Sequence, residues 1–402
     1  MNRQFWLHTA LELLESNRGF VLATLVGPPA HPLTGHHLVL EPGQTPLAGE
    51  MEFGLADPRV WADTVQSVFM QRSGRLQSFE FKSQESGASV TAGQVFLTYC
   101  SPPPEAWIFG AGHIACALSP LLNKLGWRVI VCDDRSEFAS AERFPDAAEI
   151  RAEGFEISAR ACAQRTEAWL VLVTRGHQHD QRILWEFRDQ WNFGARRPPP
   201  YIGMIGSKRR VGTVHRQLAN QGFPSQFLEV LHAPIGLPIG ADTPAEIAVS
   251  IASEMVAIRR GFHWEREAGG FRHEPERASD LADTAGRLDL WRGIAEAVSE
   301  GKATVLATIV ERRGSTPRGL GAQMAVFGNG AALGTIGGGC GESTVLRTAR
   351  EMLLGSAEPR LLRVDLTGDQ SSEAADVCGG RYSVFLEVVT LGETIHEFPS
   401  NV

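Results

Sequence analysis

The middle of the chain alternates short apolar runs with amphipathic stretches. Residues 107–109 and 129–131 are apolar runs on either side of one such stretch, and residues 170–173 and 201–205 are two more runs further along. Uninterrupted apolar runs of this length are typical of strands that are buried on both faces, and their alternation with helices indicates a parallel sheet. We therefore predict the α/β fold class, with a Rossmann-type parallel sheet domain at residues 105–260.

The two ends of the chain share a different order of elements. Residues 16–24 and 300–308 align without a gap, and each reads as a buried strand that follows an amphipathic helix. Residues 1–100 and 286–392 are therefore interpreted as two related, smaller α/β modules that flank the Rossmann-type domain, and the polar residues 261–285 as a linker. The other paired elements are hairpins at 37–51 and 323–337, helices at 57–71 and 342–354, strands at 75–81 and 360–366, and last strands at 95–97 and 384–386.

The second module has glycine-rich loops that the first lacks. These loops are GSTPR at residues 314–318, GGGCGE at residues 337–342 and CGG at residues 378–380. The corresponding parts of the first module read GPPAH, EMEFG and only Ala-Gly. We therefore interpret the first module as a degenerate, structural copy and expect the chemistry in the second.

Residues 110–115, GAGHIA, form a G-x-G-x-x-A fingerprint between a predicted strand and a predicted helix. Gly110 permits the tight turn, Gly112 lets the backbone approach a pyrophosphate, and Ala115 allows close packing of helix on strand. His113 either contacts a ligand or caps the turn. A scaffold that no longer binds a dinucleotide, or that binds another phosphate-bearing molecule, is an equally weighted alternative to a dinucleotide site.

Polar residues at the ends of later strands extend this candidate site. Asp133 ends the second strand, where an acidic residue bonds ribose hydroxyls, and Asp134 adds negative charge that favours NAD over NADP. Ser207, Lys208 and Arg209 follow another strand and place hydroxyl and cationic donors where strand ends face a ligand. The alternative for this last group is a solvated, basic start of a helix.

Composition narrows the class of protein. The chain has 402 residues, enough for two or three domains, and a formal net charge of −8, which gives no reason to expect binding to nucleic acid or to an anionic membrane. No apolar run approaches the roughly 20 residues that span a bilayer. Six cysteines without a CxxC pair indicate neither a disulfide framework nor a zinc ribbon, so we expect a cytoplasmic protein.

Longer motifs in the same regions resemble the XdhC/CoxI family. In the Rossmann part they are IFGAGHIACALSPLLNKLGWRVIVCDDR, VTRGHQHD, YIGMIGSKRR and PIGLPIGADTPAEIAVSIASEMVAIRR, and in the last module ATVLATIVERRGSTPRGLGAQMAV and GTIGGGCGESTV. The resemblance covers residues 105–260 and 286–391. It implies an accessory factor for xanthine dehydrogenase and related molybdenum hydroxylases, which binds molybdenum cofactor, protects it during sulfuration and hands it to the apo-enzyme.

Two features depart from the pattern of this family. The family usually places the cysteine-bearing domain before the Rossmann domain, whereas here it follows, and a degenerate copy occupies the front of the chain. Arg175 stands in VTRGHQHD where a histidine is expected, although His177 and Asp180 remain. These departures leave open how the ligand cleft is arranged.

Cys340 is the main chemical candidate of the last module. It follows Gly338 and Gly339 and precedes a helix predicted to begin near residues 341–343. A thiol at a helix N-terminus has a lowered pKa, and a thiolate suits both a molybdenum contact and the carriage of sulfur. For an isolated cysteine the alternative is a small buried hydrophobic residue.

Other residues of the chain are weighed against this candidate. Ser315 and Arg318 are suited to the phosphate or the pterin of the cofactor, because a guanidinium binds such groups in bidentate geometry. Cys378 is followed by two glycines and is a secondary candidate: it would lie close to Cys340 in space and contact the metal. Cys116 and Cys132 lie inside a predicted helix and a predicted strand and are interpreted as core residues.

Two functions from different classes remain open on these grounds. The first is a molybdenum-cofactor (molybdopterin) chaperone that assists sulfuration of the cofactor and its insertion into a xanthine dehydrogenase-type hydroxylase. Its partners would be the apo-enzyme and a cysteine desulfurase, and a homodimer stays open. The second is an NAD-dependent oxidoreductase acting on a small molecule, with Cys340 or His177 near the nicotinamide. The sequence offers no evident general base for hydride transfer, which favours the chaperone over a turnover enzyme.

Overall fold

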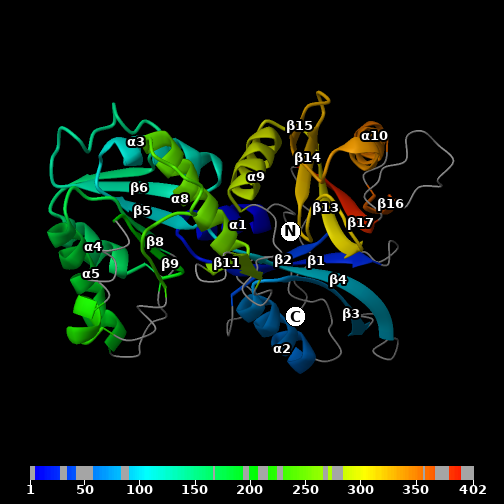
Figure 1. The fold of residues 1–402 in the computed structure, drawn as a ribbon. Coiled ribbons are helices and arrows are strands. Elements are labelled where there is room, and N and C mark those ends of the chain that lie inside the picture. Colours follow the sequence, from blue (N-terminus) through cyan, green and yellow to red (C-terminus); the bar gives the residue numbers. More distant parts are fainter. Residues whose placement is uncertain are drawn as a thin grey trace, which may run out of the picture. The chain divides into compact units, whose positions relative to one another are not determined.

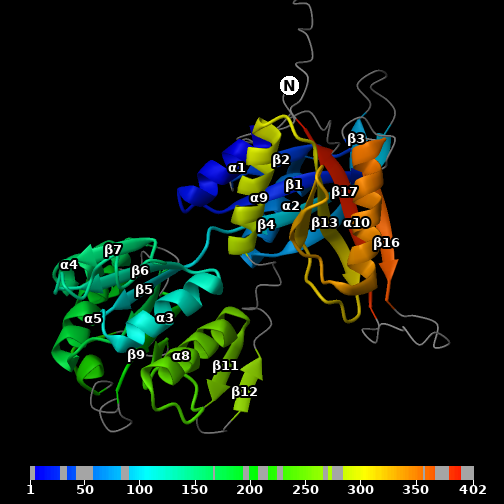
Figure 2. The ribbon, with the colours of Figure 1, turned by 90° about the horizontal axis from the view of Figure 1, so that it is seen from above.

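The chain forms two compact units, shown in Figures 1 and 2. The central unit is residues 103–278, drawn in cyan to green, and the terminal unit combines residues 1–102 with residues 279–402. The computed structural model describes residues 5–27, 34–41, 58–82, 90–165, 168–192, 199–206, 216–223, 230–265, 270–273, 284–355, 358–366 and 380–390.

The central unit is built on a six-stranded parallel sheet with the strand order β10-β9-β8-β5-β6-β7. The chain enters at β5, builds outward to β7, and crosses back to add β8, β9 and β10 on the other side. The apolar runs of the sequence form its inner strands, which are buried because helices cover both faces. The predicted Rossmann-type α/β fold is confirmed. The strands are β5 (Glu105–Phe109), β6 (Arg128–Asp133), β7 (Glu149–Ala152), β8 (Ala168–Leu172), β9 (Tyr201–Met204) and β10 (Leu231–His232).

Alternate side chains of the strands enter two separate apolar cores. Trp107 and Phe109 of β5 pack with residues of two helices on one face, and Ile108 packs with residues of two other helices on the opposite face. This alternation follows from the extended backbone, in which successive side chains point to opposite sides. The first pair of helices is α4 (Phe155–Ala163) and α5 (His177–Asn192), and the second is α3 (His113–Lys124) and α8 (Pro244–Arg259).

Residues 261–285, interpreted above as a linker, contain regular structure. Strands β11 (Phe262–Glu265) and β12 (Gly270–His273) form an antiparallel pair in which Trp264 lies opposite Phe271. Apolar and polar residues alternate along Phe262–Glu265, which is the period-two pattern of a strand. The charged composition of the whole segment concealed this short pattern.

The terminal unit contains two antiparallel sheets that share the order of four strands, and the second sheet has β15 as a fifth strand. The strand order is β2-β1-β4-β3 in the N-terminal module and β15-β14-β13-β17-β16 in the C-terminal module. The N-terminal elements are α1 (Phe5–Glu15), β1 (Phe20–Gly27), β2 (His37–Leu40), α2 (Pro58–Gln71), β3 (Gly74–Lys82) and β4 (Val90–Cys100). The C-terminal elements are α9 (Thr284–Ser299), β13 (Thr304–Arg313), β14 (Gln323–Phe327), β15 (Ala332–Gly334), α10 (Gly339–Leu354), β16 (Arg360–Asp365) and β17 (Arg381–Val389). Of the predicted hairpin at 37–51, the part beyond residue 41 lies outside the described residues.

The two modules share an irregularity in strand pairing. The register between β1 and β4 shifts at Val26, and the register between β13 and β17 shifts at Val310. These two valines are equivalent when the alignment of residues 16–24 with 300–308 is extended by two positions. They pack with Phe96 and Phe385 in one small apolar cluster, so corresponding parts of the two modules meet.

Buried polar contacts also connect the two modules. His37 Nε2 lies 2.8 Å from Glu387 Oε2, and its Nδ1 lies 2.9 Å from Thr24 Oγ1. The Arg287 guanidinium donates to the carbonyl oxygen of Tyr99 at 3.4 Å, across the module boundary. A larger apolar core contains residues of α1, β1, α9 and β13 together. The terminal unit is therefore one structure with a shared interior.

Candidate functional site

The glycine loop after β5 has the geometry that its fingerprint predicts. Gly110 has a φ of +107°, and a Cβ atom there would lie 2.5 Å from the carbonyl oxygen of Val173, so only glycine fits. Gly112 is the N-cap of α3, and a Cβ there would meet no atom of the described residues within 4 Å. Ala115 is fully buried against the sheet. The loop thus presents bare backbone and the N-terminus of a helix to open space.

Asp133, at the end of β6, holds this loop in place. Its carboxylate is 1% exposed and accepts the N–H of Ala111 at 2.8 Å and three bonds from Arg135, whose N–H, Nε and Nη2 lie at 3.1, 2.8 and 2.9 Å. Burial alone would raise the pKa of Asp133, but these hydrogen bonds outweigh burial and lower the pKa. Four donors fill the roughly four acceptor positions of a carboxylate. The ribose contact expected of Asp133 therefore has no free acceptor, and the residue positions the loop instead.

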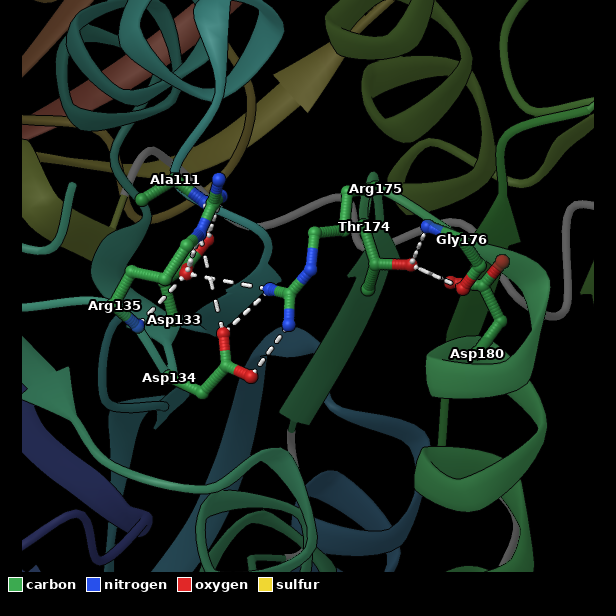
Figure 3. A network of polar contacts seen from close by, with 8 residues as sticks. All are labelled: Ala111, Asp133, Asp134, Arg135, Thr174, Arg175, Gly176 and Asp180. Carbon is green, nitrogen blue, oxygen red and sulfur yellow. Dashed lines mark hydrogen bonds and ion pairs between the residues drawn. The ribbon is translucent and has the colours of Figure 1, made fainter.

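Asp134 pairs with Arg175, which comes from the loop after β8 (Figure 3). The two terminal nitrogens of Arg175 donate to the two carboxylate oxygens of Asp134 at 2.5 and 2.7 Å. Hydrogen bonding from Arg175 lowers the pKa of Asp134 to about 2, so this carboxylate is ionised at neutral pH. The negative charge that was expected to oppose a 2′-phosphate is therefore balanced by a guanidinium.

A buried hydrogen-bond pair shapes the loop that carries Arg175. The Thr174 hydroxyl donates to Asp180 Oδ1 at 2.6 Å and accepts the N–H of Gly176 at 3.3 Å (Figure 3). Thr174 and Asp180 are 9% and 2% exposed. Sequence reasoning noted Asp180 as part of a motif but missed Thr174, and the Thr-x-Gly spacing typical of a hydroxyl-closed turn was the available signal.

Of the other candidate residues of the central unit, the structure describes only His113. His113 is the first residue of α3 and its side chain is exposed. Ser207, Lys208 and Arg209 lie outside the described residues. Their proposed part in this site stays a prediction.

In the terminal unit, the glycine loops of the C-terminal module come together. A Cβ on Gly337 would lie 2.6 Å from Cβ of Pro317, and a Cβ on Gly380 would collide with the carbonyl of Ser315. The loop that precedes α10 and the chain that enters β17 therefore both pack on the GSTPR loop. Three segments separated by up to 65 residues in the sequence, at 315, 337 and 380, form one local structure.

The loop before α10 depends on glycine and on one carboxylate. Gly337, Gly338 and Gly339 have φ values of +132°, +74° and +69°, which side chains with a Cβ rarely adopt. Glu342 Oε2 accepts the Thr335 hydroxyl at 2.6 Å and the N–H of Gly338 at 3.0 Å. Burial alone would raise the pKa of Glu342, but these hydrogen bonds and those from other N–H groups of the loop outweigh it and lower the pKa.

Cys340 is the second residue of α10, which begins at Gly339 with Gly338 as its N-cap. The helix was expected to begin near residues 341–343, so it starts about half a turn or more earlier. The reason is the glycine loop, whose left-handed conformation brings the chain into the helix directly. The side chain of Cys340 and the whole of Cys378 lie outside what the structure describes.

Arg318 and Ser315 lie at the edge of this loop cluster. The Thr316 hydroxyl donates to the carbonyl of Arg318 at 3.0 Å and closes the turn that carries both residues. Ser315 is exposed and Arg318 is half-buried. Within the described ranges, the Arg318 guanidinium makes no ion pair or hydrogen bond, which leaves its charge available to an anion.

The other cysteines do not form a second site. Cys132 is fully buried, and burial raises the pKa of its thiol to about 12, which confirms it as a core residue. Cys116 is half-buried on α3, with Arg143 Nη2 3.2 Å from its sulfur atom.

Among the described residues, no group of three or more His, Cys, Asp or Glu side chains suits a metal ion. No helix in the part of the chain that the structure describes has the length and apolar character to cross a bilayer.

Three relatives are similar to parts of this chain. Over 166 residues it is 32% identical to a probable subunit of xanthine dehydrogenase from Bacillus subtilis, covering 41% of this chain and 46% of that one. Over 114 residues it is 37% identical to the molybdenum cofactor insertion chaperone PaoD of Escherichia coli, covering 28% and 34%. Over 299 residues it is 27% identical to the uncharacterized protein YqeB of Escherichia coli, covering 71% and 51%. The chain thus spans about half the length of these relatives, or less.

Family comparison covers both of the regions described above. Residues 106–255 match the XdhC Rossmann domain, and residues 297–365 match the XdhC and CoxI family. Neither match includes residues 1–100. Over its two matched regions the chain belongs to the XdhC/CoxI family, with the XdhC Rossmann domain preceding the XdhC/CoxI domain.

Proposed function

We propose that this protein is a chaperone that binds molybdenum cofactor and assists its insertion into a molybdenum hydroxylase. The name of PaoD supports the cofactor, and the name of the Bacillus subtilis relative supports a xanthine dehydrogenase-type client. The observation that carries the proposal is the packing of the loop before α10 and of the chain at Gly380 on the GSTPR loop, at the start of α10, which Cys340 occupies. The apo-hydroxylase and a cysteine desulfurase are the proposed partners.

The loop cluster suits a large anionic cofactor. The φ of Gly338 is +74°, and a Cβ on it would meet no atom of the described residues within 4 Å. Arg318 stands nearby without an ion pair among the described residues, and a guanidinium binds a phosphate in bidentate geometry. The exposed hydroxyl of Ser315 adds a donor on the same turn. We assign these residues to the phosphate and the pterin of the cofactor.

Cys340 is proposed to contact the metal or its sulfur. Cys340 is a residue of the first turn of α10, and a cysteine at the positive end of a helix dipole is favoured as the thiolate. Glu342 keeps the preceding loop in one conformation, so it acts as a positioning residue. When bound, the cofactor would supply a soft metal centre, to which a thiolate is a suitable ligand.

The test is the cofactor content of protein purified from a cofactor-producing host. Mass spectrometry is expected to find molybdopterin with the unaltered protein and to find most of it lost from Cys340→Ala, while the protein stays folded. Cys116→Ala removes a partly exposed thiol from the central unit and serves as the matched control. Equal cofactor content in the Cys340→Ala and Cys116→Ala proteins would refute the role of Cys340, and no pterin in any of them would refute the function.

An NAD-dependent oxidoreductase is the second candidate. The sheet order and the glycine loop favour it, because dinucleotides bind at the carboxyl ends of such strands. The four hydrogen bonds that Asp133 already accepts are an argument against this candidate, because they leave its carboxylate no free acceptor for a ribose hydroxyl. Lack of NAD(H) binding at millimolar concentration would remove this candidate.

We further propose that residues 1–100 and 286–392 arose by duplication. The shared strand order, and the register shift at the equivalent positions Val26 and Val310, support this interpretation. In the N-terminal module the glycine loops were lost and the scaffold was kept. Its role is then to complete the apolar core that it shares with the C-terminal module.

A further inference from the structure

The ion pair between Asp134 and Arg175 spans the end of β5. Asp134 follows β6 and Arg175 follows β8, and these two strands are the neighbours of β5 in the sheet. The glycine loop leaves β5 between them. The order of the sheet reverses at β5 and β8, and ligands of such sheets bind in the crevice outside the carboxyl ends of the strands at this point. The pair therefore joins the two strand ends on either side of the glycine loop, at the edge of the sheet where such ligands bind.

The two carboxylates of this crevice are held very differently. Asp133 is buried and has four donors, whereas Asp134 is hydrogen-bonded by one side chain, that of Arg175. The longer contacts are Arg135 Nε to Asp134 Oδ1 at 4.0 Å and Arg175 Nη1 to Asp133 Oδ1 at 3.9 Å. The Asp134 and Arg175 side chains are 30% and 40% exposed. An ion pair this exposed biases an equilibrium by at most about fivefold, so it opens readily.

The other guanidinium of the crevice is not free to move. Arg135 is bound to the buried Asp133, and its guanidinium lies 3.7 Å from the centre of the Phe138 ring. In Figure 3 the Arg175 guanidinium reaches toward Asp134 from the side opposite to Arg135. Arg175 is thus the cation that can change partners.

We propose that the Asp134–Arg175 pair is a latch over the glycine loop, and that a phosphate-bearing ligand opens it by taking Arg175 from Asp134. Carboxylate and phosphate both accept two parallel hydrogen bonds from a guanidinium, so the exchange preserves the geometry of Arg175. Gly112 leaves space for the phosphate group, and the N-terminus of α3 supplies backbone donors to it. This latch goes beyond the proposed chaperone function and does not depend on it.

The test is titration calorimetry of the full chain with two separate probes, NAD and inorganic pyrophosphate. Asp134→Asn frees Arg175 and is expected to tighten binding by up to about fivefold. Arg175→Gln removes the phosphate contact and is expected to weaken binding about tenfold or more. Glu156→Gln is the matched control, because it removes the same charge from an exposed pair with Arg182 that joins α4 to α5 and does not include Arg175. This control is expected to leave both affinities unchanged.

The decisive comparison is the double variant Asp134→Asn with Arg175→Gln. If Asp134 acts only by holding Arg175, the double variant binds both probes as the Arg175→Gln protein does. Tightening that persists without Arg175 would overturn the latch, since it would reflect loss of repulsion alone. Weaker or unchanged binding by Asp134→Asn, or no binding of either probe by any variant, would also overturn it. Tightening for NAD but not for pyrophosphate would overturn the assignment of Arg175 to the phosphate. Cofactor content is measured separately, so failure of the latch leaves the chaperone test intact.

Discussion

Replacing Asp133 by asparagine removes a buried charge while keeping nearly the same shape. The carboxylate is 1% exposed and accepts four hydrogen bonds, three of them from Arg135. The amide of asparagine keeps one acceptor oxygen, but its NH2 group replaces the second oxygen and cannot accept the two N–H groups that point at it. About two hydrogen bonds are therefore lost. Charge-assisted hydrogen bonds contribute roughly 1.5–3 kcal/mol each. Because Arg135 is 30% exposed and keeps part of its hydration, we take the lower end and expect a loss of about 3 kcal/mol.

Native-state hydrogen exchange, read by mass spectrometry on peptides within residues 105–135, measures this loss where it arises. A loss of about 3 kcal/mol corresponds to exchange that is faster by a factor on the order of 100. Asp134→Asn is the control, because its exposed pair contributes at most about 1 kcal/mol. Equal exchange rates in the two variants would refute the assignment of Asp133 as the residue that holds the loop.

The pH dependence of the same experiment provides a second check. The pKa of Asp133 is lowered in the folded protein from its ordinary value of 3.8. A depressed carboxylate pKa contributes stability that is present above the unfolded pKa and is lost as the pH falls through the folded pKa. The difference between the unaltered protein and Asp133→Asn is therefore expected to shrink below pH 3.8. A difference that stayed constant down to the acid limit of folding would show that charge is not its cause.

Three further changes test other parts of the structure. Gly110→Ala places a Cβ 2.5 Å from the Val173 carbonyl oxygen at a φ of +107°. We expect the free energy of unfolding, measured by thermal denaturation, to fall by about 2 kcal/mol or more. Gly112→Ala, whose Cβ would meet no described atom within 4 Å, is the control and is expected to show no such loss. His37→Ala leaves the buried Glu387 without its nearest partner, and we expect a loss of about 3 kcal/mol and a lower melting temperature of the terminal unit; an unchanged melting temperature would contradict the shared interior. Glu342→Gln weakens the acceptor for the Gly338 N–H, and we expect hydrogen exchange of that amide to accelerate about tenfold. Glu351→Gln changes an exposed carboxylate on the same helix and is the control. Because the pKa of Glu342 is lowered, its stabilisation is expected to be complete above pH 4.5 and to disappear as the pH falls further.

Local sequence patterns predicted four of the six strands of the central sheet, β5, β6, β8 and β9, but not the short strands β7 and β10. The apolar runs at 107–109 and 129–131 are strands because a sheet covered on both faces requires them to be apolar throughout. Thr243 and Glu246, three residues apart, form a capping box at the start of α8. Such features depend on residues within one turn or one strand, so the sequence contains all that decides them.

The sequence was less informative where a pattern was short or a glycine changed the path of the chain. The strands at 262–265 and 270–273 were hidden by charged neighbours, because four residues give little periodicity to detect. The start of α10 was placed too late, since left-handed backbone at Gly338 and Gly339 is not visible in the letters themselves. In both cases the backbone conformation carried the information.

The sequence by itself determined the fold class, the repeated order of elements in the two modules, and the glycine loops in which chemistry was to be sought. Only the tertiary structure decided which polar groups are free. Asp133 and Asp134 are adjacent in the chain, yet four donors fill the first, while the second is held by one exposed arginine 41 residues away. The physical reason is that the availability of a charged group depends on its burial and its partners. Both are set by strands that are distant in the sequence and neighbours in the sheet.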